Sequence, residues 1–143
     1  MSDLTISLEP DAAQEDVRAV YDGLHAFSHS HAGDAQYQTI RFFLRDAAGT
    51  VAGGLIADML WGWMFVQVLW VAEAHRGGGH GTALMRRAED EARRRGCRAM
   101  WLDTFTFQAP EFYRKLGFTE FGRLGDFPPG YARHFMMKPL DPA

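Results

Sequence analysis

The chain has 143 residues, 47% of them hydrophobic and 13% aromatic, which suits a single domain over residues 1–143. Its 15 lysine and arginine residues and 18 aspartate and glutamate residues give a formal net charge of -3, which excludes a global attraction to nucleic acid or anionic lipid. The single cysteine, Cys97, excludes an internal disulfide and is expected to be a buried structural thiol. The N-terminal residues lack the basic-then-apolar pattern of a secretory signal, so we expect a cytoplasmic protein.

The chain is expected to begin with a strand and a helix. Residues 4–8 alternate apolar and polar side chains, as a half-buried strand does, and Pro10 stops the pattern. From Asp11 the apolar residues recur at helical spacing, with acidic residues in the first turn, which predicts a helix to about Phe27. Residues 28–38 are expected to form a surface loop or a short second helix.

Strands are expected to follow. Residues 39–45 and 50–57 are predicted strands, joined by a loop with hairpin turn chemistry. The apolar stretch 53–71 is long enough to span a bilayer, but its glycines and its β-branched and aromatic content favour two antiparallel strands. The second of these, residues 61–71, is expected to be long.

The second half of the chain alternates helices and strands. The expected order is helix, strand, short helix and two strands, over residues 83–95, 99–105, 110–116, 118–124 and 132–138. Because a helix separates strand 61–71 from strand 99–105, these two strands should be parallel and joined by a right-handed crossover.

The most informative segment is glycine-rich and lies between strand 61–71 and the following helix. It reads Arg76-Gly77-Gly78-Gly79-His80-Gly81-Thr82. A backbone with so few Cβ atoms can bend until several N–H groups converge, and the helix start adds unpaired N–H groups and a positive dipole end. This combination predicts a phosphate-binding site. The spacing fits neither a dinucleotide fingerprint nor a Walker A loop, which leaves the pattern Arg-x-x-Gly-x-Gly.

A second motif follows downstream. The chain continues through helix and strand to Ala109-x-x-Phe112-Tyr113-x-Lys115-Leu116-Gly117-Phe118. Together the two motifs resemble the GNAT superfamily of acyl-CoA-dependent N-acyltransferases, and the order of elements from Leu4 to Lys138 is similar as well. The resemblance implies a single N-acetyltransferase domain with an α/β fold: a central mixed, mostly antiparallel sheet of about seven strands, with a splayed parallel pair, flanked by about four helices.

The resemblance also implies that acetyl-CoA is the cofactor and which residues bind it. The glycine-rich segment would hold the pyrophosphate, mainly through backbone donors, and the exposed backbone of the strand before it would pair with the pantetheine arm. Thr106 stands where many relatives have an asparagine, and its hydroxyl is expected to hold the cofactor arm. The expected cofactor-binding residues are Leu69, Trp70, Val71, Arg76, Gly77, Gly78, Gly79, His80, Gly81, Thr82, Thr106, Ala109 and Phe112.

Tyr113 is the expected catalytic residue. It shares a helix face with Ala109, and the resemblance implies that its hydroxyl lies near the thioester sulfur and protonates the departing thiolate. A phenol with an unperturbed pKa of about 10 can fill this role at neutral pH. The alternative is a tyrosine hydroxyl that is hydrogen-bonded at the edge of the core.

The base that deprotonates the amine is left open. Many relatives have a glutamate on the strand before the glycine-rich segment, whereas this strand has Gln67. Glu73, His75 and Asp103 are alternatives, but each has an ordinary structural role to offer, and we expect deprotonation through water.

The acceptor is expected to be a primary amine of a small molecule or peptide, which attacks directly in a ternary complex. Aromatic residues and an aspartate are expected to form its pocket, namely Phe27, Trp61, Trp63 and Asp126, with Phe127 and Tyr131 as further possibilities. No metal and no nucleic-acid or membrane partner is expected, whereas exposed C-terminal strands favour a homodimer. Two alternatives remain: a catalytically silent acyl-CoA-binding or sensor module, and a structural protein whose glycine-rich segment binds nothing.

Overall fold

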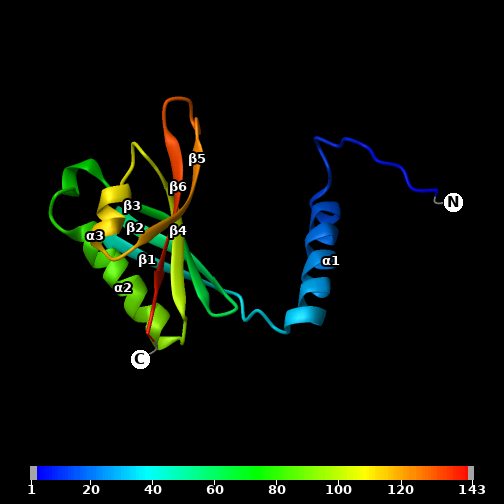
Figure 1. The fold of residues 1–143 in the computed structure, drawn as a ribbon, viewed down its shortest axis with the longest axis horizontal. Coiled ribbons are helices and arrows are strands. Elements are labelled where there is room, and N and C mark those ends of the chain that lie inside the picture. Colours follow the sequence, from blue (N-terminus) through cyan, green and yellow to red (C-terminus); the bar gives the residue numbers. More distant parts are fainter. Residues whose placement is uncertain (1–2, 142–143) are drawn as a thin grey trace. The chain divides into compact units, whose positions relative to one another are not determined.

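The computed structural model describes residues 3–141, which fall into two compact units that divide after Ala35. The first unit holds one helix, α1 (Gln14–Ala32) (Figure 1). Residues 4–8 are not in a strand, so the predicted first strand is wrong. Alternation of side chains makes a strand only where a second strand pairs with the backbone, and within residues 3–141 none pairs with this segment.

Helix α1 ends later than its apolar pattern predicts. Gly33 ends it with a φ of 75°, and the Gly33 N–H donates to the carbonyl of His29 at 2.9 Å. Within the last turns the Ser30 hydroxyl donates to the Phe27 carbonyl at 2.6 Å, and the His31 Nδ1 lies 2.9 Å from the same oxygen. These polar side chains bond to the helix that carries them, and residues 28–32, predicted as part of a loop or a short second helix, continue α1.

The second unit is built on one sheet with the strand order β1-β2-β3-β4-β6-β5 (Figure 1). The strands are β1 (Gln38–Arg45), β2 (Val51–Leu60), β3 (Trp63–Val71), β4 (Ala99–Phe105), β5 (Thr119–Gly125) and β6 (Ala132–Pro139). β3 and β4 are parallel, and every other neighbouring pair is antiparallel. The mixed, mostly antiparallel sheet is confirmed, with six strands and three α-helices in residues 3–141 where about seven and four were expected.

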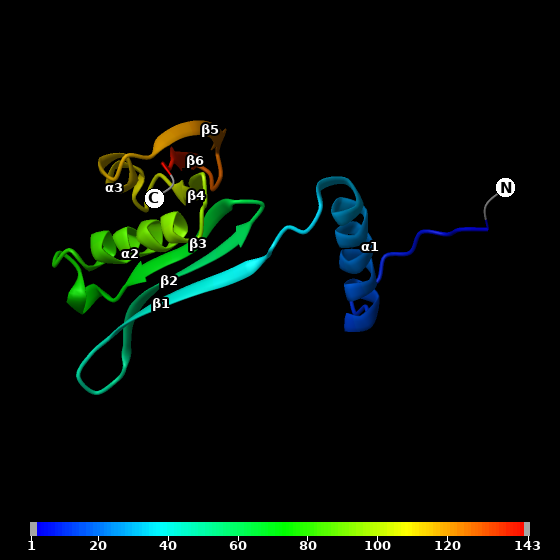
Figure 2. The ribbon, with the colours of Figure 1, turned by 90° about the horizontal axis from the view of Figure 1, so that it is seen from below.

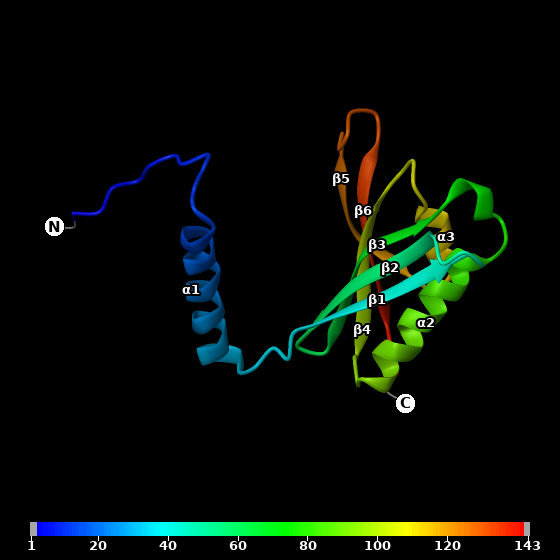
Figure 3. The same cartoon turned by 180° about the vertical axis from the view of Figure 1, so that it is seen from behind.

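Two helices of this unit pack on the sheet. α2 (His80–Arg94) crosses β1 to β4 on one face, and α3 (Pro110–Lys115) lies near its N-terminal half (Figures 1 and 2). Their buried side chains share one core with the inward-facing residues of the sheet. The fully buried helix alanines Ala88 and Ala92 present little side-chain volume to the sheet. Within residues 36–141, the opposite face of β1 to β4 carries no helix (Figure 3).

The turn between β2 and β3 is tight. Trp61 and Gly62 occupy it with positive φ angles of 47° and 76°, as a two-residue hairpin turn requires. The predicted strand 61–71 therefore begins two residues late, at Trp63.

Among the described residues, no helix is both long and apolar enough to cross a membrane.

The parallel strands β3 and β4 pair over only part of their length. The pairing runs from Trp63–Ala99 to Val66–Leu102, and both strands continue beyond it. β3 carries a bulge at this point, because Ala57 of β2 faces Val66 and the preceding Ile56 faces Val68. Beyond the bulge β3 lies so close to β2 that a Cβ atom on Gly53 would be 2.6 Å from the Trp70 carbonyl oxygen. β3 therefore follows β2 and leaves β4.

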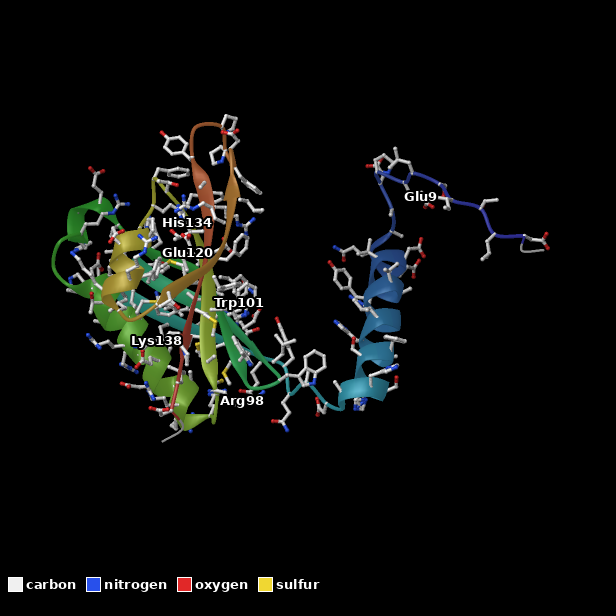
Figure 4. The ribbon with its side chains drawn as sticks, viewed as in Figure 1. Glu9, Arg98, Trp101, Glu120, His134 and Lys138 are labelled. Atoms are coloured by element: carbon white, nitrogen blue, oxygen red, sulfur yellow. The ribbon has the colours of Figure 1, made fainter. Side chains whose placement is uncertain are left out.

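An ion pair joins three elements on the covered side of the sheet. Lys138 of β6, labelled in Figure 4, donates from Nζ to Glu89 of α2 at 2.6 Å and to the Leu116 carbonyl after α3 at 2.8 Å. Arg93 donates to the other Glu89 oxygen at 3.1 Å. Burial raises the pKa of Glu89, but these two donors more than offset it, so that the pKa is lowered overall.

Replacing Lys138 with methionine should lower the free energy of unfolding by about 2 kcal/mol at pH 7, since a carboxylate and a carbonyl lose their shared donor. A carboxylate with a lowered pKa stabilises the fold above its unfolded-state pKa and loses this effect as pH falls through its folded-state value. The difference between wild type and Lys138→Met should therefore shrink below pH 4.5. Urea unfolding across this range measures it.

Lys115→Met, a change at an exposed lysine, is the matched control and should unfold like the wild type. An equal loss in both variants, or a loss in Lys138→Met that does not change with pH, would contradict the role given to the ion pair.

Candidate functional site

A cavity of about 920 Å³ lies where β3 and β4 separate. Its lining comes from β3, the glycine-rich segment, the start of α2, the end of β4 and α3. All expected cofactor-binding residues except Gly78 and Thr106 line it, together with Tyr113. Segments far apart in the sequence thus meet around one space.

One wall of the cavity is a free strand edge. Past Val66, the described residues contain no strand that pairs with the edge of β3 that faces β4. Leu69, Trp70 and Val71 lie on this stretch, and their other edge pairs with Leu55, Gly54 and Gly53 of β2. Apart from the Val71 carbonyl, which accepts from Arg76, the backbone groups that a paired strand would use are therefore available to an extended ligand.

The glycine-rich segment forms the phosphate-binding end. Gly77 and Gly79 both have a φ of 82°, a left-handed conformation that favours glycine. Gly79 caps α2, which begins at His80, three residues before the predicted start, so Gly81 and Thr82 lie in the first turn. No side chain caps this helix end. Its first N–H groups therefore remain available for an anion and coincide with the positive end of the dipole.

Two contacts fix the shape of this end. Arg76 donates from Nε to the Val71 carbonyl at 2.9 Å, which ties the segment back to the end of β3. A Cβ atom on Gly81 would lie 3.4 Å from the Phe112 ring, so the start of α2 approaches α3 closely. A pyrophosphate at the helix start and an extended arm along β3 fit this arrangement, and the residues present are suited to coenzyme A.

Tyr113 lies at the inner end of the same cavity. It is 8% exposed and packs edge-to-face against Phe112 and Phe118, at centroid distances of 5.1 and 6.0 Å. Burial, and then the negative charge of Asp103, raise the pKa of Tyr113 to about 12. The phenol therefore keeps its proton at physiological pH and can act as a proton donor.

Asp103 lines the cavity next to the point of strand separation. It follows Leu102, the last β4 residue that pairs with β3. One of its carboxylate oxygens accepts from Arg133 of β6 through Nε at 3.0 Å and Nη2 at 2.9 Å. The carboxylate is held in place by one oxygen, close enough to Tyr113 for its charge to act on the phenol.

A second carboxylate, that of Asp58, contacts Gln67 on the cavity wall. Gln67, at the bulge of β3, lines the cavity and donates from its side-chain amide to Asp58 of β2. The Thr39 hydroxyl of β1 donates to the other Asp58 oxygen at 3.4 Å. The sequence shows a glutamine where many relatives have a glutamate. Only the register of β2 and β3 reveals that the side chain of this glutamine contacts an aspartate of the neighbouring strand.

Thr104, rather than Thr106, supports the loop that leads into α3. Thr104 is 2% exposed, and its hydroxyl accepts from the Ala109 N–H at 3.3 Å and donates to the Gln108 side chain at 3.3 Å. Gln108 also accepts from the Phe105 N–H at 2.9 Å, and it lines the cavity. Neither Thr104 nor Gln108 was expected at the site.

Thr106 lies outside the cavity because β6 engages its hydroxyl. The Ala132 N–H donates to Thr106 Oγ1 at 2.9 Å, and the buried His134 ring nitrogen lies 2.9 Å from the same oxygen. The other ring nitrogen of His134 contacts Glu120 of β5 (Figure 4). This hydrogen-bonded chain joins the β4–α3 loop to the β5–β6 hairpin, and the expected role of Thr106 toward the cofactor arm does not match its position.

Three of the residues expected at the acceptor pocket, Trp61, Trp63 and Asp126, do not line the cavity. Trp61 lies in the β2–β3 turn and Trp63 pairs with Ala99, at the end of β3 away from the cavity, and neither residue lines it. Asp126 lies in the β5–β6 loop with a φ of 50°, also outside the cavity lining. Phe27 belongs to the first unit, where its ring contacts His31 at 4.3 Å.

The remaining sequence-based alternatives also differ in position. His75 lines the cavity, whereas Glu73 of the short 3₁₀ turn does not. Arg114 of α3 pairs with Glu111 and, at 3.5 Å, with Glu120. Cys97 is buried and free, as expected, and burial raises the pKa of its thiol.

Comparison with known proteins agrees with this geometry. The Acetyltransferase (GNAT) family matches residues 8–118. The acetyltransferase Atu2258 of Agrobacterium fabrum (strain C58 / ATCC 33970) is 35% identical over 127 residues, 89% of this chain and 93% of the relative. The blasticidin-S acetyltransferase of Streptomyces morookaense is 41% identical over 93 residues, 64% of this chain and 68% of the relative.

A solved structure extends the likeness to the fold. The crystal structure of an acetyltransferase from Bacillus cereus ATCC 14579 superposes with a TM-score of 0.85 at 28% sequence identity, covering 94% of this chain and 98% of that one. The family match spans more than half of the chain. It includes the glycine-rich segment, Tyr113 and the two strands that separate, β3 and β4. The chain belongs to the GNAT family of acetyl-CoA-dependent N-acyltransferases.

Proposed function

We propose that the chain transfers the acetyl group of acetyl-CoA to a primary amine of a small molecule or peptide, by direct attack while both substrates are bound. The observation that carries the proposal is the presence of Tyr113 and a phosphate-binding helix start in one cavity. A free strand edge links the two. The relative that is named a blasticidin-S acetyltransferase supports a small-molecule acceptor.

Tyr113 acts as the proton donor in this proposal. Acetyl-CoA supplies a thioester carbonyl that a neutral amine can attack. Tyr113 holds a proton at its hydroxyl for the sulfur that leaves, and its pKa of about 12 keeps that proton in place until the sulfur becomes basic. An ammonium loses two protons on its way to the amide. One replaces the phenol proton, and the other goes to solvent.

The carboxylates beside the strand separation receive the amine in this proposal. Asp103 lines the cavity with one oxygen committed to Arg133, and Asp58 stands behind Gln67. A carboxylate attracts the ammonium form and can pass its proton to water, which keeps the water-mediated deprotonation expected from the sequence. Asp103 is the better placed, since it lies on the cavity wall with Tyr113.

A catalytically silent acyl-CoA-binding module is the second candidate. It is favoured by Gln67, which stands on β3 where many relatives have a glutamate. Such a module would bind coenzyme A through the same cavity without turnover.

The predictions on domain organisation, localisation and oligomeric state stay predictions. We propose a single acetyltransferase domain in the cytoplasm, in keeping with the buried free thiol of Cys97. β5 is an edge strand of the sheet, which supports a homodimer formed by strand pairing.

Tyr113→Phe should lower kcat about 100-fold, because the ring packing is kept and only the proton donor is lost. The dissociation constant for coenzyme A should stay within about twofold. Thiol release from acetyl-CoA with a panel of amines measures kcat, and calorimetry measures coenzyme A binding. Since the pKa of Tyr113 is about 12, ionisation of the phenol should cause no fall in wild-type kcat between pH 8 and 10.

Tyr37→Phe, at an exposed tyrosine, is the matched control and should keep full activity. Unchanged turnover in Tyr113→Phe would refute the donor role. Coenzyme A binding with no thiol release from any amine in the wild type would favour the silent module.

Gly79→Ala should weaken coenzyme A binding about 10-fold or more, because alanine disfavours the left-handed conformation that starts α2. Gly96→Ala provides the control, since Gly96 follows the other end of α2 with a similar φ of 79° and does not line the cavity. Both variants should lose about 1 kcal/mol of stability. Thermal unfolding and calorimetry separate the two effects, and equal coenzyme A affinity in both variants would contradict the phosphate-binding role.

A further inference from the structure

Aromatic rings gather beside the cavity at the end of β4, on the β4–α3 loop and on the β5–β6 loop. We call Phe105, Phe107, Phe127 and Tyr131 the aromatic platform. Their rings form a chain: Phe127 lies 5.6 Å from Phe105, Phe105 lies 5.5 Å from Phe107, and Phe107 meets Tyr131 edge-to-face at 5.0 Å. These distances are typical of favourable aromatic contacts, so the β4–α3 loop and the β5–β6 loop are held together by rings.

The aromatic platform is open to solvent. Phe107 is 56% exposed, Tyr131 47% and Phe127 42%. Phe107 also lines the cavity, so the platform extends the cavity wall from β4 toward the β5–β6 loop. Exposed rings that border a cavity and contact one another are characteristic of a surface that a ligand covers.

Arg133, a cation beside the aromatic platform, is already engaged. The Arg133 guanidinium lies over the rings of Phe105, Phe127 and Phe135, with centroid distances of 5.6, 5.4 and 5.3 Å, and is paired with Asp103. The ion pair therefore offsets part of the charge of both Arg133 and Asp103. The surface offers ring faces and edges to a ligand rather than a free positive charge, which disfavours an anionic acceptor.

Asp103 and Phe107 connect the platform to the reacting end of the cavity. Both line the cavity with Tyr113, while Asp103 contacts Arg133 and Phe107 contacts Tyr131. An acceptor whose body covers the platform would thus have its amine on the side of Asp103. Aromatic edges and faces favour a planar ring over a saturated skeleton of the same size.

We propose, building on the acetyltransferase function above, that the acceptor is a primary amine with a planar aromatic or heteroaromatic ring, which lies against Phe107 and Tyr131 while the amine faces Asp103. The platform then selects the acceptor, and Tyr113 and the phosphate-binding helix start serve every acceptor alike.

Two amines that share a carbon skeleton, one with an aromatic and one with a saturated ring, test the proposal. 2-Phenylethylamine and 2-cyclohexylethylamine have the same carbon skeleton and the same terminal amine. The wild type should use the aromatic amine with about 5-fold higher kcat/KM. Phe107→Leu and Tyr131→Leu remove one ring each and keep an apolar side chain, and each should bring the ratio close to 1. Phe43→Leu changes an exposed ring on β1 outside the cavity lining and should keep the ratio.

Binding gives a readout that does not need turnover. Calorimetry of the coenzyme A-saturated protein should show the same preference for 2-phenylethylamine, and the same loss in the two platform variants. Asp103→Asn should weaken binding of both amines about 10-fold and leave their ratio unchanged, since the lost charge interaction is common to them.

The outcomes separate the two proposals. Thiol release with equal kcat/KM for the two amines, or a preference that survives Phe107→Leu and Tyr131→Leu, overturns the ring selectivity and leaves the acetyltransferase function standing. Selective binding of the aromatic amine without thiol release supports the platform and overturns the enzymatic function.

Discussion

The site depends on the early end of backbone pairing between β3 and β4. If the two parallel strands stayed paired beyond Val66 and Leu102, their edges would be satisfied and no cavity would open between them. The bulge at Gln67 and the close approach of β3 to β2 at Gly53 make the separation possible. The backbone groups of β3 that no longer pair with β4 form a free edge. An extended ligand can form hydrogen bonds along this edge. The paired part of the two strands carries the stacked rings of Phe65 and Trp101, 4.2 Å apart.

The covered face of the sheet turns this separation into a site. α2 packs against β1 to β4, and its N-terminus therefore lies at the cavity, where its unpaired N–H groups can meet a phosphate. α3 brings Tyr113 into the same core, and Lys138 joins β6 to α2 and to the end of α3. The donor half of the reaction is thus supported by buried contacts. The proposed acceptor half rests on exposed rings from two loops, which are freer to vary between relatives.

Local signals in the sequence marked the segments that line the cavity. The glycine-rich segment needs backbone conformations that few residues adopt, so Gly77 and Gly79 mark it without knowledge of the fold. The strand boundaries 99–105 followed from apolar content, and the parallel pairing of β3 and β4 followed from the helix between them. Phe112 and Tyr113 lie on a short helix whose first residue, Pro110, is a helix-start signal in the sequence. Family resemblance then joined motifs that lie far apart in the chain.

Features that depend on distant pairing could not be predicted. Thr104 and Thr106 are two residues apart, and only the end of β4 and the approach of β6 decide that Thr104 supports α3 while Thr106 bonds to Ala132. Asp58 stands behind Gln67 because of strand register, which no local pattern encodes. Trp61 has strong strand propensity, yet the tight turn with Gly62 overrides it. The alternation of apolar and polar side chains at residues 4–8 likewise predicted a strand, but no other strand among the described residues pairs with this segment.

The charge of Asp103 links the two halves of the site. Because this charge contributes to the high pKa of Tyr113, a cation that settles beside Asp103 offsets it and makes the phenol a stronger acid. In the proposed reaction, arrival of the amine thus makes the phenol proton easier to transfer to the leaving sulfur, and by reciprocity loss of that proton strengthens binding of the cation. Without the amine, the phenol is a weaker acid, and water that enters the cavity meets a thioester with a poorer leaving group. In the proposed reaction, the same carboxylate therefore favours transfer to the amine over hydrolysis of the thioester.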